Sequence, residues 1–391
     1  MIYLILTGIL LFYALYMFIN IIAGMFYSSP VYEHIDTDHS FLLFYPAYKP
    51  TEQVVDNLNI MKAEIADVNA KLYVLSQDAT SEINEQIEDI ADYFDAASFS
   101  SGEGNAYHKA LQFAAGRISK ISTGQQRIKS VMIMDPDNVT DQASIKRLLQ
   151  GRVEGADVVL SRRKATNNSA DESLFDGISE RINDYMMRRS KQVFGLIPEL
   201  SGSGMLMDRQ LFEQAVMKLD RKAPGMDKQL LINMMSLKQD LKVLFDEGAV
   251  IYDEKTEEAN AFNRQRMRWF GNQYYNARVF GWALIRSLNP SRMDYAIALC
   301  RPPRSVHIVF SMILAPFDLM MFLNGWVSAP LIALSAAALG LSLSAFFINE
   351  GIGGRVLRQI FSLSKISIQN GITAFKSLKP GNTGTFIHTR S

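Results

Sequence analysis

Two carboxylates, Asp135 and Asp137, come directly after the apolar run Val131 to Met134 in the segment VMIMDPDNVT. A surface turn is one explanation, because Asp, Pro and Asn are common turn residues. A metal and phosphate site is the other, because aspartate oxygens are hard ligands that suit Mg²⁺ or Mn²⁺. The ten residues by themselves favour the turn, so the choice depends on the elements that position them.

Between His39 and Asp253, short apolar runs alternate with amphipathic segments. The pattern predicts strands over 41–48, 71–80 and 131–134, and helices from Thr51, over 81–94 and over 105–118. Such alternation predicts an α/β domain with a mostly parallel sheet, which binds ligands at the carboxyl ends of its strands. Polar turns follow the three strands at 46–50, 77–80 and 135–138, and their convergence favours a nucleotide site.

Two other regions are apolar enough for a bilayer. Residues 1–26 carry no charge, and residues 306–348 form two apolar halves separated at Asn324 to Trp326. The first region is long enough to cross a bilayer core, which takes roughly 20 helical residues, and the two halves of the second region predict a helical hairpin. A cleaved signal peptide is the alternative for the first, but it lacks a basic start and an A-x-A site. Asp318 is costly in mid-bilayer and is expected to face another helix or the interface.

Charge and composition limit the classes of binding partner and metal site that the chain can have. The chain has 391 residues with 40 basic and 40 acidic side chains, and this neutrality argues against nucleic acid as a partner. Its one cysteine excludes an intrachain disulfide, and its five scattered histidines lack zinc-ligand spacing. Arg and Lys flank the outer ends of the second apolar region, so the positive-inside rule places the polar middle in the cytoplasm.

Seven segments occur in an order that resembles the membrane-bound family 2 glycosyltransferases, which include cellulose and hyaluronan synthases. The segments lie within residues 41–277 and are FLLFYPAYKPTE, SQDAT, GEGNAYHKAL, MDPDN, SGSGMLMD, GMDKQLLINM and RQRMRW, the last containing Q-x-x-R-W. The resemblance implies a GT-A fold: a Rossmann-like, mixed but mostly parallel sheet with flanking helices, and transmembrane helices at both ends.

The resemblance also implies roles on the donor side. Asp137 is expected to bind Mg²⁺ or Mn²⁺, which neutralises the diphosphate leaving group, and Asp135 to contact the donor or share the metal. The remaining donor contacts are expected from Tyr48 and Asp78 at the base, and from Gln265 and Arg268 at the diphosphate. An arginine can make a two-pronged contact with phosphate oxygens. For Tyr48, a plain packing role is the alternative.

On the acceptor side, Asp227 in GMDKQLL occupies the position of the family's catalytic aspartate. It would remove the acceptor proton, and the reaction would then invert the anomeric configuration. The sequence departs from the family pattern at Met226, where an acidic neighbour is usual, and at Glu103, where many relatives carry Lys. Gly204 and Trp269 are expected to contact the acceptor, although tryptophan could instead pack the domain against the membrane interface.

The expected organisation has five parts: an N-terminal transmembrane helix (1–27), a GT-A domain (38–277), interfacial helices (278–304), a transmembrane hairpin (305–349) and a basic amphipathic tail (350–391). The expected function is inverting transfer from a nucleotide sugar, such as a UDP-sugar, to a lipid-linked or growing polysaccharide acceptor at the cytoplasmic face of a bacterial-type plasma membrane. An export partner, an assembly partner or a homo-oligomer is compatible with this. A catalytically silent nucleotide- or glycan-binding subunit is the alternative.

Overall fold

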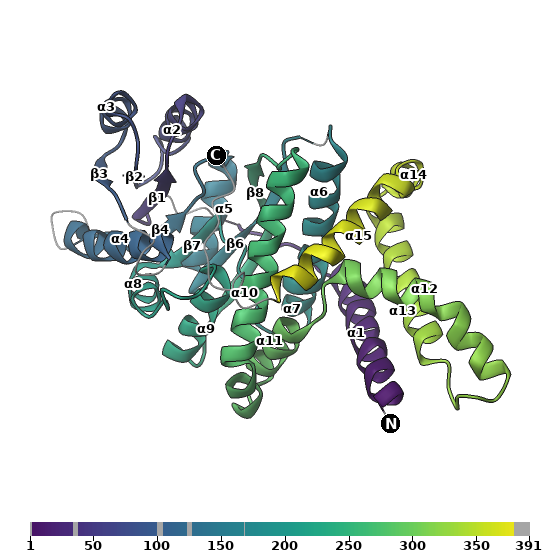
Figure 1. The fold of residues 1–391 in the computed structure, drawn as a ribbon. Helices are drawn as coiled ribbons and strands as arrows, with labels where there is room; N and C mark the ends of the chain where they lie inside the picture. The colour runs from purple at the N-terminus through teal and green to yellow at the C-terminus, as the bar shows by residue number, and fades with distance from the viewer. Residues whose placement is uncertain (1, 34–37, 100–104, 123–126, 168, 379–391) are drawn as a thin grey trace.

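The computed structural model describes the chain except residues 1, 34–37, 100–104, 123–126, 168 and 379–391. Its centre is a sheet with the strand order β3-β2-β1-β4-β7-β6-β8-β5 (Figure 1). The strands are β1 (Phe41–Tyr48), β2 (Ala70–Gln77), β3 (Tyr93–Ala97), β4 (Ser130–Ile133), β5 (Val139–Thr140), β6 (Val158–Ala165), β7 (Met205–Asp208) and β8 (Val243–Asp253). β7 runs antiparallel to β4 and β6, β5 runs antiparallel to β8, and the other pairs are parallel.

Helices cover both faces of the sheet, because successive side chains of a strand point to opposite faces. In β1, Leu42 and Phe44 pack against one helical layer, and Leu43 and Tyr45 against the other. The first layer contains α4 (Ala106–Ser122), α8 (Arg209–Met217) and α9 (Asp227–Leu237). The second contains α2 (Glu52–Glu64), α3 (Ser81–Ile90) and α5 (Gln142–Val153). The expected fold class, a mixed and mostly parallel sheet with flanking helices, is therefore confirmed.

The helix expected over 81–94 is four residues shorter in the structure, and Tyr93–Ala97 form the edge strand β3. The reason is tertiary. The Asp92 carboxylate accepts hydrogen bonds from the Leu72 N–H at 2.8 Å and from Lys62 Nζ at 2.6 Å, which hold residue 92 against β2. These contacts outweigh the local helical pattern.

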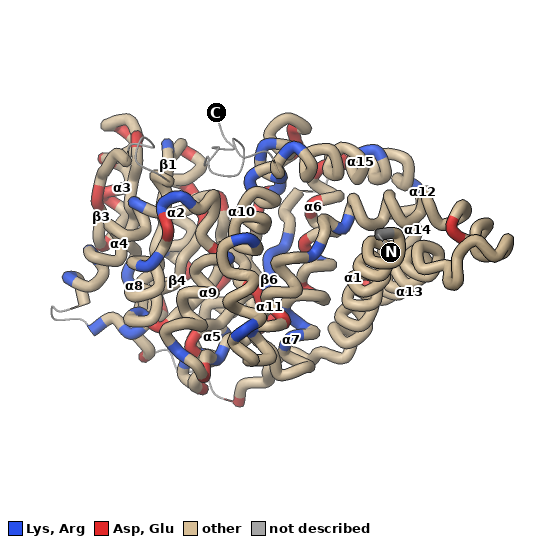
Figure 2. Tube along the Cα trace, turned by 60° about the horizontal axis from the view of Figure 1, so that its bottom comes forward, with Lys and Arg blue, Asp and Glu red and all other residues tan. Residues whose placement is uncertain are grey.

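Three helices in the described part of the chain are long and apolar enough to cross a membrane. They comprise α1 (Ile2–Met25), α12 (Arg304–Leu323) and α13 (Leu331–Asn349). Figure 2 shows that Lys, Arg, Asp and Glu gather on the sheet domain, whereas these helices are almost free of them. The buried Asp318 carboxylate accepts hydrogen bonds from the N–H groups of Ile332 and Ala333 at 2.9 and 3.0 Å. It therefore faces another helix, as expected, and satisfies the first turn of α13.

The sheet domain contacts α1 through a π-helical segment. After α6 (Asp171–Asn183), residues Asp184–Arg189 form the π-helix η2, which continues into α7 (Ser190–Val193). Gly24 of α1 lies so close to η2 that an added Cβ would stand 2.6 Å from the Tyr185 carbonyl oxygen. Tyr185 and Met186 pack in one cluster with residues of α1 and α13. A larger residue at position 24 would separate α1 from the domain.

Two long elements connect the domain to the α12–α13 hairpin. α10 (Ala259–Arg286) is a continuous helix, so the boundary expected between residues 277 and 278 falls inside it, and α11 (Pro290–Cys300) folds back along it. After the hairpin come α14 (Gly353–Arg358) and the expected amphipathic segment, α15 (Ile360–Ser377). α15 lies across α10 and α12 (Figure 1).

Candidate active site

A cavity of about 1200 Å³ opens at the carboxyl ends of β1, β2 and β4 and continues to the apolar helices α12, α13 and α15. Seven of the residues that the sequence singles out line it: Tyr48, Asp135, Asp137, Asp227, Gln265, Arg268 and Trp269. These residues come from a strand end, the turn after β4, the start of α9 and one face of α10. The fold thus brings both ends of the expected chemistry, donor and acceptor side, into one space.

The turn that contains Asp135 and Asp137 is held from behind by Ser203. The Ser203 hydroxyl oxygen accepts hydrogen bonds from the Asp135 N–H at 2.9 Å and from Asn138 Nδ2 at 2.7 Å. The Tyr45 hydroxyl donates to the Asn138 carbonyl oxygen at 3.1 Å. Asn138 and Ser203 are fully buried. The turn is therefore an anchored part of the domain that presents two carboxylates to the cavity, and a plain solvent-exposed turn does not describe it.

Replacing Ser203 by Ala should destabilise the protein by about 1 to 3 kcal/mol, because Asp135 N–H and Asn138 Nδ2 both lose their acceptor. The loss would appear as a lower thermal midpoint of the detergent-solubilised protein. Ser98→Ala, which changes an exposed serine, is the matched control and should leave the midpoint unchanged. Equal midpoints for the two variants would contradict the anchoring role of Ser203.

The electrostatic surroundings of Asp135 suit a bound cation. Burial raises the pKa of Asp135 to about 7, the nearby Asp137 and Asp253 add to the effect, and Arg163 and Arg268 oppose it. A divalent cation would remove this excess of negative charge. Among the described residues, no group of three or more His, Cys, Asp and Glu side chains is arranged to hold a metal ion. Asp135 and Asp137 fit a cation whose remaining ligands come from the donor phosphates or water.

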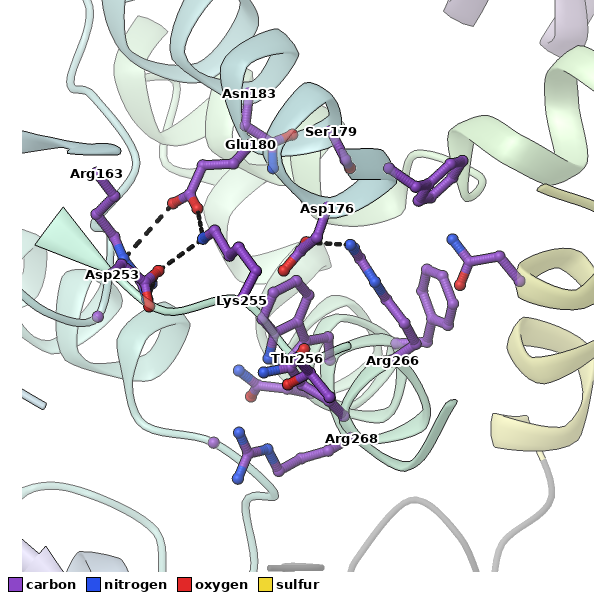
Figure 3. A pocket seen from close by; sticks show the side chains of 18 of the residues that line it. Arg163, Asp176, Ser179, Glu180, Asn183, Asp253, Lys255, Thr256, Arg266 and Arg268 are labelled. Carbon is purple, nitrogen blue, oxygen red and sulfur yellow. Dashed lines mark hydrogen bonds and ion pairs between the residues drawn. The ribbon is translucent and has the colours of Figure 1, made fainter. Parts of the chain in front are cut away.

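A network of charged residues, which the sequence reasoning missed, lines the same cavity as the two aspartates. Figure 3 shows its members Arg163, Glu180, Asp253 and Lys255. Arg163 Nη2 is 2.5 Å from Asp253 Oδ2, and Lys255 Nζ pairs with Asp253 at 2.6 Å and with Glu180. Although burial by itself raises the pKa of Glu180, Lys255 and Arg163 lower it to about 2. Like Asp135, Arg163 and Asp253 lie toward the carboxyl ends of their strands, β6 and β8, where such sheets bind ligands.

The Q-x-x-R-W residues lie on one face of α10, because positions i, i+3 and i+4 are neighbours on a helix. Burial lowers the pKa of the Arg268 guanidinium, whereas Asp135, Tyr107 and Asp227 favour its charged form. Arg268 thus interacts electrostatically with both Asp135 and Asp227. The Arg266 guanidinium, which is paired with Asp176 (Figure 3), lies 4.6 Å from the centre of the Trp269 ring.

Asp227 is the first residue of α9, and Asn272 positions its carboxylate. Asn272 Nδ2 donates to Asp227 Oδ1 at 2.8 Å, and Lys228 Nζ lies 3.8 Å from Asp227 Oδ2. Met226, in place of the acidic neighbour, is buried in the hydrophobic core. Asn272 therefore supplies a contact that the sequence reasoning missed. The sequence could have indicated Asn272, because it follows Gln265 by seven residues and such positions share a helix face.

Lys228 is held in turn by a buried carboxylate, and this pair makes stability depend on pH. Burial raises the pKa of Glu199, but Lys228 and Arg301 lower it to about 2. A lowered pKa in the folded state stabilises the protein above the unfolded pKa, near 4.5, and the contribution is lost as the pH falls toward 2. The shift corresponds to about 3 kcal/mol.

The thermal midpoint of the wild type should therefore fall between pH 5 and pH 3 more steeply than that of Glu199→Gln, which has no carboxylate to protonate. The control Glu82→Gln alters an exposed glutamate and should keep the wild-type slope. Parallel slopes for wild type and Glu199→Gln would show that Glu199 does not titrate in this way.

Two of the expected site residues are not among the described residues that line the cavity. Asp78 is exposed in a left-handed conformation (φ 53°) just beyond β2, where Gln77 lines the cavity instead. Gly204 has φ +67° and lies against Ser161 and Ile251, where an added Cβ would approach to 2.4 Å. Its role in this arrangement is close packing. Glu103 lies outside the described residues.

Comparison with solved structures supports the fold. Over 95% of both chains, the protein is similar to the mannosyltransferase PcManGT from Pyrobaculum calidifontis in complex with GDP-Man and Mn²⁺, with 12% sequence identity and a TM-score of 0.56. It is also similar to a mycobacterial protein over 62% of this chain and 74% of that one, with 11% identity and a TM-score of 0.40. No protein-family model and no curated protein matches the chain. The likeness to PcManGT confirms the GT-A type of fold.

Proposed function

We propose that the protein is a metal-dependent, inverting glycosyltransferase of the family 2 type that moves a sugar from a nucleotide sugar to a lipid-linked or polysaccharide acceptor. The observation that carries the proposal is the single cavity in which Asp135 and Asp137, Arg268 and Asp227 come together. Asp135, Asp137 and Arg268 would hold a diphosphate and its cation. Asp227 would accept the proton of a hydroxyl nucleophile. A protein that only binds a nucleotide has no need for a positioned base.

The donor is expected to be a nucleoside diphosphate sugar held with Mn²⁺ or Mg²⁺. PcManGT, whose fold this chain shares, was solved with GDP-Man and Mn²⁺, so GDP-mannose joins the UDP-sugars as a donor to test. Asp137 and Asp135 would hold the cation, which supplies charge neutralisation at the diphosphate. Arg268 and Gln265, on the same face of α10, would hold the diphosphate oxygens, and Tyr48 at the end of β1 would contact the base.

The chemistry of the chain's own residues follows from their positions. Asp227 would accept the proton of the acceptor hydroxyl while that oxygen attacks the anomeric carbon, which inverts the configuration. Asn272 and Lys228 hold the Asp227 carboxylate in place. Trp269 offers an apolar ring to the acceptor sugar, and the adjacent Arg266 guanidinium fixes the plane of that ring.

We also propose a membrane location. α1, α12 and α13 have the length and composition of membrane spans. Arg301 and Arg304 precede the hairpin and Arg355 and Arg358 follow it, so the positive-inside rule puts the catalytic domain on the cytoplasmic side of a bacterial-type plasma membrane. The cavity would then open toward the cytoplasmic leaflet. Three spans leave room for an export partner, an assembly partner or a second copy of the chain.

A donor screen tests the proposal. Full-length protein in detergent would be heated with Mn²⁺ and each of several nucleotide sugars, since a ligand that binds only the folded state raises the midpoint. At least one donor should raise the midpoint with Mn²⁺ and fail to do so with EDTA. That donor should then support sugar transfer or slow hydrolysis. Metal-dependent binding without either reaction would favour the silent-subunit alternative, and no binding at all would reject the proposal.

A further inference from the structure

Four residues of the segment RPPRS (301–305) line the cavity where its polar part meets the apolar helices: Arg301, Pro303, Arg304 and Ser305. The two prolines fix the backbone between the arginines, because each holds φ near −65°. The proposed transferase reaction uses neither arginine. Both nevertheless line the cavity, where an enclosed charged side chain lowers stability unless it is paired.

Arg304 and Ser305 have hydrogen-bonding groups without partners. Arg304 Nη2 donates to the Ser179 carbonyl and hydroxyl oxygens at 2.9 and 2.8 Å, but the enclosed Arg304 Nη1 has no acceptor in the described part of the structure. The Ser305 hydroxyl is also without a partner, and the residue is only 6% exposed. Both residues belong to the first turn of α12, a helix of 20 residues that no side chain caps. Unpaired backbone N–H groups at such a terminus favour an anion.

Nearby carboxylates do not neutralise these cations. The nearest to Arg301 is Glu199, at 3.6 Å, and Glu199 is already paired with Lys228. Lys228 also lies 3.8 Å from Asp227, and Arg304 forms no ion pair within the described residues. Two carboxylates thus face three cations. This part of the cavity therefore has an excess of positive charge. Lys228 is next in the chain to Asp227, so the positive region reaches the proposed base.

The wall beyond Arg304 is apolar. Ile308 and Val309 of α12, Leu343 and Phe347 of α13, and Ile360 and Leu363 of α15 all line the same cavity. α12 and α13 are candidate membrane spans. A ligand that fills this region must therefore combine a hydrocarbon chain with an anionic group at the first turn of α12.

We propose that Arg304, together with Arg301, Ser305 and the first turn of α12, binds the phosphate of a lipid-phosphate-linked acceptor, whose hydrocarbon chain lies along α12, α13 and α15. The inference rests on the proposed function, which it deepens by naming the class of acceptor. Arginine suits this role because its planar group presents several donors to phosphate oxygens. The sugar carried by the phosphate would extend toward Asp227, and the chain would remain among the apolar helices.

Binding of farnesyl phosphate, a short lipid monophosphate, tests the site in the full-length protein in detergent. Isothermal titration should show at least tenfold weaker binding to Arg304→Gln than to the wild type, and a smaller weakening for Ser305→Ala. The control Arg358→Gln removes an exposed arginine of α14 that does not line the cavity, and it should bind like the wild type. Farnesol, which lacks the phosphate, should bind the wild type at least tenfold more weakly than farnesyl phosphate does. The wild type and Arg304→Gln should bind farnesol equally.

Several results would overturn the inference. These are unchanged binding of farnesyl phosphate to both Arg304→Gln and Ser305→Ala, equal binding of farnesol and farnesyl phosphate, or equally tight Arg304-dependent binding of inorganic phosphate. Displacement of farnesyl phosphate by an equal concentration of phosphatidylglycerol would indicate a binding site for bilayer lipids. This result would also overturn the inference. If Arg304→Gln fails to fold, Ser305→Ala decides.

Donor binding separates this inference from the proposed function. With Mn²⁺, the nucleotide sugar that stabilises the wild type should stabilise Arg304→Gln to the same extent. Arg304-dependent binding of farnesyl phosphate by a protein that binds no donor would keep the lipid-phosphate site and reject the transferase. Donor binding and transfer without Arg304-dependent binding of farnesyl phosphate would do the reverse.

Discussion

Asp227→Asn should reduce sugar transfer by about 10²- to 10⁴-fold while leaving donor binding intact, because the amide cannot accept the acceptor proton. The substitution keeps the shape of the side chain. Asn272 Nδ2 can still donate to the oxygen at position 227, so the start of α9 should not move. Initial rates of transfer from the identified donor, together with the midpoint shift on donor binding, measure the two effects separately.

Asp240→Asn is the matched control for this prediction, because it alters an exposed aspartate beyond the other end of α9. It should leave transfer at the wild-type rate. Wild-type activity in Asp227→Asn would show that Asp227 does not act as the general base. A loss of donor binding that equals the loss of rate would instead assign Asp227 to the donor site.

Asp137→Asn is expected to weaken Mn²⁺-dependent donor binding by about 100-fold or more, because a neutral amide is a much poorer ligand for a divalent cation than a carboxylate. Asp135 would remain as the second carboxylate of the turn, but it would then have to hold the cation without Asp137. Titration of the donor at fixed Mn²⁺, followed by the midpoint shift, measures the change.

Asp56→Asn on the exposed face of α2 serves as the control and should bind donor and metal normally. Binding without Mn²⁺ should be weak in the wild type and in both variants. If Asp137→Asn retained the full metal-dependent shift, the cation would have to be held elsewhere, and the strand-end interpretation of MDPDN would fail.

The parts of the fold that the sequence predicts are those set by local patterns. Phe41–Tyr48 and the run before Asp135 are apolar and bounded by turn residues, so they appear as buried strands in both sequence and structure. The first two residues of β3, Tyr93 and Phe94, were predicted as the end of a helix, because the partner strand β2 and the Asp92 contacts do not appear in the local pattern. Tertiary contacts decide such short edge strands.

The same distinction explains the site. Asp135, Asp137 and Asp227 occur in recognisable segments, and the structure places all three at the cavity. The pairs Arg163–Asp253 and Glu180–Lys255 join residues 90 and 75 positions apart, so spacing along the chain does not reveal them. Gly204 shows the opposite case: it belongs to a recognisable segment, yet in the structure Ser203 beside it makes the contact with the Asp135 turn.

The close contact between Gly24 and η2 bears on how this protein can be prepared. Tyr185, Met186 and Met187 are buried in a cluster shared with α1 and α13. A fragment trimmed to the sheet domain would expose that cluster to water, and an exposed apolar patch of this kind promotes aggregation. The first helix is thus an integral part of the folded unit as well as a candidate membrane span. Soluble versions are better sought by redesigning the outward faces of α1, α12 and α13 than by cutting the chain at residue 38.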